Sequence, residues 1–128
     1  MKKTVVIGAS ENTERYSNRV VRMLHHQSIP VIAIGLKEGE IDARLNDEVG
    51  QGIKIQTGLS KIENVDTVTL YVGPQHQAQY YDYVLSLKPE RVIFNPGTEN
   101  SEFEKKLKDN GIEVQEACTL TMLTVGNF

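Results

Sequence analysis

The residues best suited to chemistry form a small turn, Gly8-Ala9-Ser10, which directly follows a β-branched run at residues 4–7. Glycine lets the backbone turn sharply, and the small side chains of Ala9 and Ser10 leave the amides open to a ligand. A helical pattern begins near Ser17, so the turn lies beside a helix N-terminus, where unpaired N–H groups and the helix dipole favour anions. This arrangement of strand, turn and helix predicts a site for the diphosphate of a nucleotide.

Three basic residues near this turn are candidates for contacts with ligand phosphates: Arg15, Arg19 and Lys37. Arg15 and Arg19 are explained equally well as solvated side chains. Lys37 follows the second predicted strand, where an NAD site has an acidic residue for the ribose 2′-hydroxyl. Glu38 and Glu40 come slightly later and are weaker candidates for that acidic role. A lysine here favours a ligand with an additional ribose phosphate, as in NADP or coenzyme A.

The turn is not the complete dinucleotide fingerprint G-x-G-x-x-G, because Ser10 and Thr13 occupy the later glycine positions. The sequence contains no recognisable pairing of nucleophile and base, no phosphate-binding lysine motif and no metal-ligand spacing. His76 is the best acid–base candidate, although a surface histidine at a helix start is the preferred interpretation. The sequence therefore predicts ligand binding and identifies no catalytic residue.

Composition narrows the class of protein further. The 128 residues suffice for one domain with its own core, and 39% of them are apolar. A net charge of −3 and the lack of a basic stripe argue against nucleic-acid binding. No apolar run approaches the roughly 20 residues of a membrane span, and no signal-peptide pattern is present, so we expect a cytoplasmic protein. Cys118 is the one cysteine, which excludes an internal disulfide.

Strand and helix patterns alternate along the chain. We expect the helix after the first turn to be capped by Ser17, and a capping box of Ser101 with Glu104 to open a later helix that ends at Gly111. A long charged segment at 36–52 has no clear pattern, apart from a helical turn that is compatible with 40–46. The expected strands are 3–7, 30–35, 53–57, 66–72, 91–94 and 112–114, and the expected helices are 17–28, 75–88, 101–110 and a short one at 119–125.

This order predicts an α/β protein with a Rossmann-like three-layer fold and a mostly parallel sheet. In such sheets, ligands bind at the carboxyl ends of the strands, where the strand order reverses. We therefore expect the small-residue turns after three strands to lie along one edge and to form the site. Besides Gly8, Ala9 and Ser10, these turns contain Val72, Gly73 and Pro74, and Asn95, Pro96 and Gly97.

Several stretches give the chain a specific resemblance. They are Val-Ile-Gly-Ala-Ser at 6–10, Ser17-Asn18-Arg19-Val20, Val72-Gly73-Pro74, and Cys118 after the last strand. In these the chain resembles the small stand-alone CoA-binding domain family, whose domain is similar to the N-terminal part of the succinyl-CoA synthetase α subunit. The family usually ends its second strand in Asn-Pro, whereas this chain has Gly35-Leu36 there.

The resemblance implies a protein that binds coenzyme A or an acyl-CoA through its diphosphate, and because its residues present no catalytic constellation, we expect it to catalyse no reaction alone. It would act as a carrier, sensor or regulatory subunit, with a protein partner supplying any catalysis. An NADP-dependent oxidoreductase fragment and a structural subunit with a decayed site remain alternatives. Cys118 is either a small buried residue or a thiol that faces the pantetheine arm. The expected binding residues are Gly8, Ala9, Ser10, Arg15, Ser17, Asn18, Arg19, Lys37, Val72, Gly73, Pro74, Gln75, Asn95, Pro96, Gly97 and Cys118.

Overall fold

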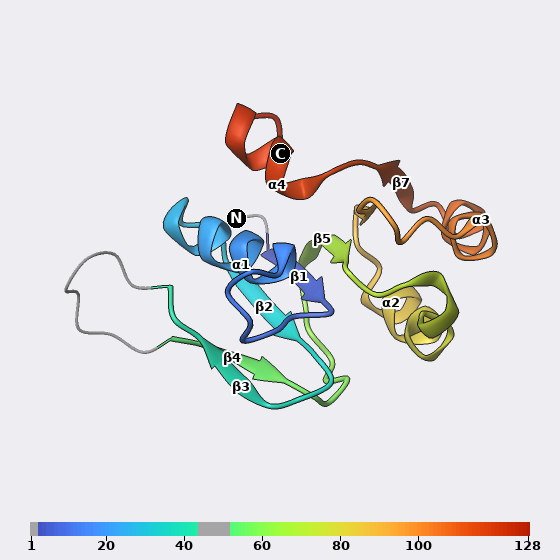
Figure 1. Cartoon of the computed structure of the whole chain (residues 1–128). Coiled ribbons are helices and arrows are strands. Elements are labelled where there is room, and N and C mark those ends of the chain that lie inside the picture. Colours follow the sequence, from blue (N-terminus) through green and yellow to red (C-terminus); the bar gives the residue numbers. More distant parts are fainter. Residues whose placement is uncertain (1–2, 44–51) are drawn as a thin grey trace.

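A sheet of seven strands forms the centre of the molecule, and helices cover both of its faces (Figure 1). The computed structural model describes residues 3–43 and 52–128. None of the helices in these two ranges is long and apolar enough to cross a membrane. The elements are β1 Lys3–Ile7, α1 Tyr16–His26, β2 Val31–Ile34, β3 Gly39–Ile41, β4 Ile53–Gln56, β5 Val65–Leu70, the 3-10 turns η1 Pro74–His76 and η2 Ala78–Tyr80, α2 Tyr81–Leu87, β6 Arg91–Phe94, α3 Ser101–Asp109, β7 Glu113–Glu116 and α4 Thr119–Val125.

The strand order is β3-β4-β2-β1-β5-β6-β7, and every neighbouring pair is parallel except β3 with β4. The central strand β1 has β2 on one side and β5 on the other, so that Val5 lies opposite both Ile32 and Val68. Strands β2, β4 and β3 extend the sheet on one side of β1, and the later strands β5, β6 and β7 extend it on the other side. The predicted parallel Rossmann-like sheet is confirmed, and its strand order reverses between β1 and β5.

Two apolar clusters, one on each face of the sheet, hold the layers together. On one face, α2 and α3 pack against alternate residues of β1, β5 and β6, and Phe94 and Phe103 are completely buried there. On the other face, α1 and α4 pack over Val6 and Ala33, with Leu24 of α1 and Leu123 of α4 in the cluster. These clusters fix the carboxyl ends of β1 and β5 side by side.

Helix caps differ from the sequence prediction by one or two positions. Arg15 is the N-cap of α1, whereas Ser17 is a buried residue inside the helix, because a tight turn from Asn12 to Arg15 starts the helix early. In α3 the cap is Asn100 in place of Ser101: its side chain accepts from Phe103 N at 3.1 Å, and Glu104 accepts from Asn100 N at 3.2 Å.

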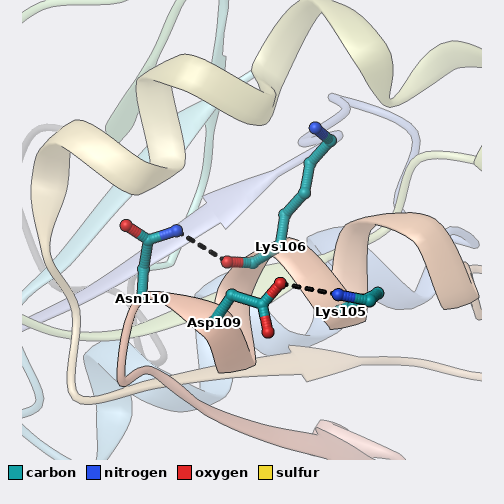
Figure 2. Close-up of polar contacts among 4 residues, drawn as sticks. All are labelled: Lys105, Lys106, Asp109 and Asn110. Atoms are coloured by element: carbon teal, nitrogen blue, oxygen red, sulfur yellow. Dashed lines mark hydrogen bonds and ion pairs between the residues drawn. The ribbon is translucent and has the colours of Figure 1, made fainter.

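The end of α3 agrees with the sequence. Gly111 has a φ of +75° just after the helix, and Ile112 N donates to Leu107 O, the bond that closes a glycine C-cap. Within the last turn, Lys105 pairs with Asp109 at 2.8 Å, and the Asn110 side chain donates to the carbonyl of Lys106 at 2.8 Å (Figure 2). The predicted inner face of Phe103 and Leu107 is confirmed.

The helix predicted at 75–88 is broken into η1, η2 and the short helix α2. The cause is Gln77, whose buried side-chain amide donates to Val72 O at 2.8 Å and to Thr98 O at 2.7 Å. These bonds tie the segment to the ends of two strands, so the α-helix begins only at Tyr81. Of the predicted inner face, Val84 is buried, Tyr81 and Leu85 pack against the core while partly buried, and Ala78 is exposed. The other buried residues of this segment are Tyr80, Tyr83 and Leu87.

The sequence prediction missed β3, which is a short edge strand antiparallel to β4. A helical turn at 40–46 is therefore wrong for residues 40 and 41, and residues 44–46 lie outside the described ranges. A side chain from the first turn stabilises β3, because the carboxylate of Glu11 accepts from Glu40 N at 3.1 Å. This contact fixes the segment after β2 against the loop that follows β1.

Candidate functional site

A cavity of about 600 Å³ opens at the carboxyl ends of β1 and β5, where the strand order reverses. Its walls come from the turn after β1, the start of α1, the segment after β2 and the segment after β5. Half of the predicted binding residues line it: Gly8, Ala9, Ser10, Arg15, Ser17, Lys37, Val72 and Gly73. Leu36, Tyr16, Tyr71, His76, Gln79 and Tyr80 complete the wall.

Gly8 has a structural reason to be glycine. Its φ is +98°, and a Cβ at this position would lie 2.9 Å from the carbonyl carbon and oxygen of Tyr71. The amides of Gly8 and Ala9 both donate to the carbonyl of Ile34 at 2.9 Å. The expectation that the turn leaves these amides open is therefore wrong, because β2 lies close enough to bind both. Gly8 lets β1, β2 and β5 come together beneath the cavity.

The N-terminus of α1 supplies open donors in their place. The first N–H groups of a helix have no partner within the helix. Here Arg15 provides no side-chain cap, and the first turn contains no acidic residue. The amides of Tyr16 and Ser17 thus remain as donors in the cavity wall, next to Arg15. An anion placed there would meet both N–H groups and the positive end of the helix dipole.

Asn18 has a supporting part in this arrangement. The residue is 1% exposed, and its side-chain amide donates to Ser10 O at 2.9 Å. Its Oδ1 accepts from Arg22 Nε at 2.8 Å. Asn18 therefore fixes the turn to α1 and does not line the cavity. Arg19 also lies outside the cavity wall, with its guanidinium carbon 5.7 Å from the centre of the Tyr16 ring.

The charge of the cavity wall differs from that of the whole chain. Apart from His76, the acidic and basic side chains among the described residues of this wall are Arg15 and Lys37, both cations, although the chain carries a net charge of −3. The two come from opposite sides, one at the start of α1 and one after β2. Two apolar side chains stand beside them at the rim, since Tyr16 is 63% and Leu36 is 81% exposed.

The third predicted turn, after β6, does not line the cavity. Asn95 is 2% exposed and is fully engaged: Nδ2 donates to Thr69 Oγ1 at 2.7 Å and to Leu70 O at 2.8 Å, and Oδ1 accepts from Thr119 N at 2.9 Å. Pro96 and Gly97 are exposed outside the cavity wall, as are Pro74 and Gln75 in η1. Asn95 thus connects β5, β6 and α4 within the sheet layer.

Cys118 is the N-cap of α4, and it is half-buried without lining the cavity. Burial raises the pKa of its thiol, but the Thr121 hydroxyl and the amides of Thr121 and Leu120 outweigh that effect, so the pKa lies below its usual value. The nearby Tyr71 hydroxyl is buried without a hydrogen-bond partner among the described residues. Burial, and secondarily Cys118, raises the pKa of that phenol.

The described ranges contain no group of three or more His, Cys, Asp and Glu side chains arranged to hold a metal ion.

Comparison with known sequences decides the family. The profile of the family described as "CoA binding domain" matches residues 2–124, nearly the whole chain. This chain belongs to the CoA-binding domain family. No curated protein matches it significantly.

Solved structures share the fold of this chain. A protein described as "uncharacterized" is 47% identical, with a TM-score of 0.90, and the match covers 100% of this chain and 98% of that one. The cell-free ID.343 protein from Thermus thermophilus is 28% identical, with a TM-score of 0.77 and coverage of 99% and 90%. A hypothetical protein from Pyrococcus horikoshii OT3 is 24% identical, with a TM-score of 0.79 and coverage of 94% and 80%, and supports the fold alone.

Sequence reasoning missed five residues of the cavity wall in this CoA-binding domain. Tyr16, Leu36 and Tyr71 each adjoin a residue that was predicted, so closer attention to the flanks of the turns would have found them. Gln79 and Tyr80 gave no such signal, because a continuous helix from residue 75 places them on the wrong face. Only the break introduced by Gln77 brings them to the cavity.

Proposed function

We propose that this protein binds coenzyme A or an acyl-CoA in the cavity between β1 and β5, through the nucleotide diphosphate. The observation that supports this most is the purely cationic set of charged side chains in the cavity wall of an acidic chain. Coenzyme A carries three phosphates, and both cations lie where parallel sheets bind nucleotides. Membership of the family supports the same ligand class.

The ligand's phosphates have distinct partners in this proposal. The diphosphate accepts hydrogen bonds from the amides of Tyr16 and Ser17 and pairs with Arg15. The adenosine extends toward the end of β2, the position of the adenosine ribose in related folds. There Lys37 pairs with the 3′-phosphate, and the exposed side chain of Leu36 contacts the adenine.

We infer that the domain catalyses no reaction alone and serves as a carrier, sensor or regulatory subunit. His76 is the acid–base group in the described cavity wall, and that wall offers no carboxylate to orient its ring. An oriented base is the usual requirement for general acid–base or nucleophilic catalysis. A protein partner would supply the chemistry.

An NADP-dependent oxidoreductase fragment or subunit stays the second candidate, because Lys37 in the cavity wall suits a 2′-phosphate as well as a 3′-phosphate. Isothermal titration with four ligands separates the two. We expect coenzyme A to bind best, dephospho-CoA about threefold to fivefold more weakly because the Lys37 pair is exposed, and NAD least. If NADP binds as tightly as coenzyme A, the oxidoreductase is favoured. If NAD binds better than coenzyme A, Lys37 pairs with neither a 2′-phosphate nor a 3′-phosphate, and both proposals fail.

A further inference from the structure

Tyr80 is a buried residue that lines the cavity and has an unused hydroxyl. The side chain is 4% exposed, and its ring packs in the cluster beneath α2. The hydroxyl forms no hydrogen bond to any described residue. Tyr83, three residues further along and outside the cavity wall, instead donates from its hydroxyl to Ser60 O at 2.6 Å. Burial raises the pKa of Tyr80, which keeps the phenol protonated and able to donate at neutral pH.

The place of Tyr80 along the cavity indicates which part of a ligand it meets. Leu36 and Lys37 follow β2 at one end of the cavity, while Tyr80 ends η2, beyond the carboxyl end of β5. With the adenosine at the β2 end and the diphosphate at α1, the rest of the ligand leads toward β5. It passes Val72 and Gly73, which line this stretch, and reaches η1 and η2.

Two more polar side chains join Tyr80 at this end. His76 and Gln79 both line the cavity, and Gln79 Nε2 donates to His76 O at 3.3 Å. That bond leaves the side-chain oxygen of Gln79 as an acceptor. The β5 end therefore offers a hydroxyl donor beside an amide acceptor, and no acidic or basic residue among the described ones except the histidine.

We propose that Tyr80 and Gln79 form a subsite for the pantetheine arm, in which the Tyr80 hydroxyl donates to a carbonyl oxygen of the arm. The arm carries two amides, and each presents a C=O acceptor and an N–H donor that match this pair. The inference rests on the proposed function, because it assumes a CoA-type ligand. Its consequence is a preference for coenzyme A and its thioesters over the bare nucleotide.

The preference follows from the position of this hydroxyl. The Tyr80 residue is 4% exposed, yet its hydroxyl is open to the cavity and unlike the Tyr71 hydroxyl is not fully buried. A ligand carbonyl that displaces water there accepts one hydrogen bond from the phenol. A nucleotide that ends at its diphosphate does not reach this contact. The arm thus acquires a specific anchor, and the affinity difference between coenzyme A and its nucleotide portion measures it.

The test compares Tyr80→Phe with the wild-type protein by isothermal titration, with coenzyme A and with adenosine 3′-phosphate 5′-diphosphate, the nucleotide portion of coenzyme A. We expect coenzyme A to bind about threefold to tenfold more weakly to the variant, as for one lost hydrogen bond, and the nucleotide to bind equally to both proteins. The melting temperature should not fall, because the hydroxyl has no partner in the protein.

Tyr83→Phe is the matched control, because it removes a hydroxyl from the same segment outside the cavity wall. It should lower the melting temperature through the lost bond to Ser60 and leave both affinities unchanged. Equal weakening of both ligands by Tyr80→Phe, or no weakening of coenzyme A, would overturn the arm subsite while the proposed function stands. If the wild-type protein binds neither ligand, the proposed function and the arm subsite both fail.

Discussion

Replacing Asn95 by alanine tests whether this residue holds the sheet together or binds ligand. The side chain is 2% exposed and joins Thr69, Leu70 and Thr119 through three hydrogen bonds of 2.7–2.9 Å. Its removal leaves the buried amide of Thr119 without its acceptor. An orphaned buried group costs about 1–3 kcal/mol and each lost hydrogen bond about 0.5–1.5 kcal/mol, so we expect Asn95→Ala to lower the free energy of unfolding by about 3 kcal/mol.

Urea unfolding followed by circular dichroism measures this loss, which is a large fraction of the roughly 5–15 kcal/mol typical of a domain. Asn110→Ala provides the matched control, because its side chain makes one exposed bond to Lys106 O. The control should lose less than about 1 kcal/mol. Folded Asn95→Ala should bind coenzyme A with unchanged affinity. A loss below about 1 kcal/mol, or a large loss of affinity at full stability, would refute the structural assignment of Asn95.

Three further predictions follow from the site. Gly8→Ala should lower the free energy of unfolding by about 2–5 kcal/mol, because alanine is strained at a φ of +98° and its Cβ overlaps the Tyr71 backbone. Thermal denaturation measures this, and a variant that melts at the wild-type temperature would contradict the prediction. Lys37→Ala should weaken coenzyme A about threefold to fivefold without affecting dephospho-CoA, and an equal effect on both would refute the phosphate contact. Cys118 should react with iodoacetamide along a pH profile whose midpoint lies below that of an ordinary thiol, since its pKa is lowered; a midpoint at or above the ordinary value would contradict the thiolate stabilisation.

The sequence predicted the parallel sheet, and the residues around its first turn line the cavity, because both features depend on local patterns. Buried strands such as β1 are continuous apolar runs, and a strand followed by a small turn and a helix defines the reversal of strand order. Arg15 and Lys37 were found because each adjoins such a boundary. The sharp turn predicted at Gly8 is present, with a φ of +98° at the glycine, but the nearby Tyr71 backbone could not be predicted from the sequence.

What the sequence did not predict depends on contacts between distant segments. The amides of Gly8 and Ala9 are bound by Ile34, a residue of another strand, and no pattern near the turn indicates this. Gln77 breaks a helix because its side chain reaches Thr98, and that break moves Tyr80 into the cavity wall. The edge strand β3 is short and charged, and the carboxylate of Glu11 in another loop helps to fix it.

An amide chemical-shift titration with coenzyme A tests the central claim most directly. In ¹⁵N-labelled protein, the account predicts the largest shifts at Tyr16 and Ser17, with smaller shifts at Lys37 and Gly73 along the cavity. The exposed residue Gly97 lies outside the cavity wall and serves as the internal reference. Saturable shifts centred on the start of α1 would support a diphosphate bound there, whereas no shifts, or shifts centred on the turn after β6, would contradict it.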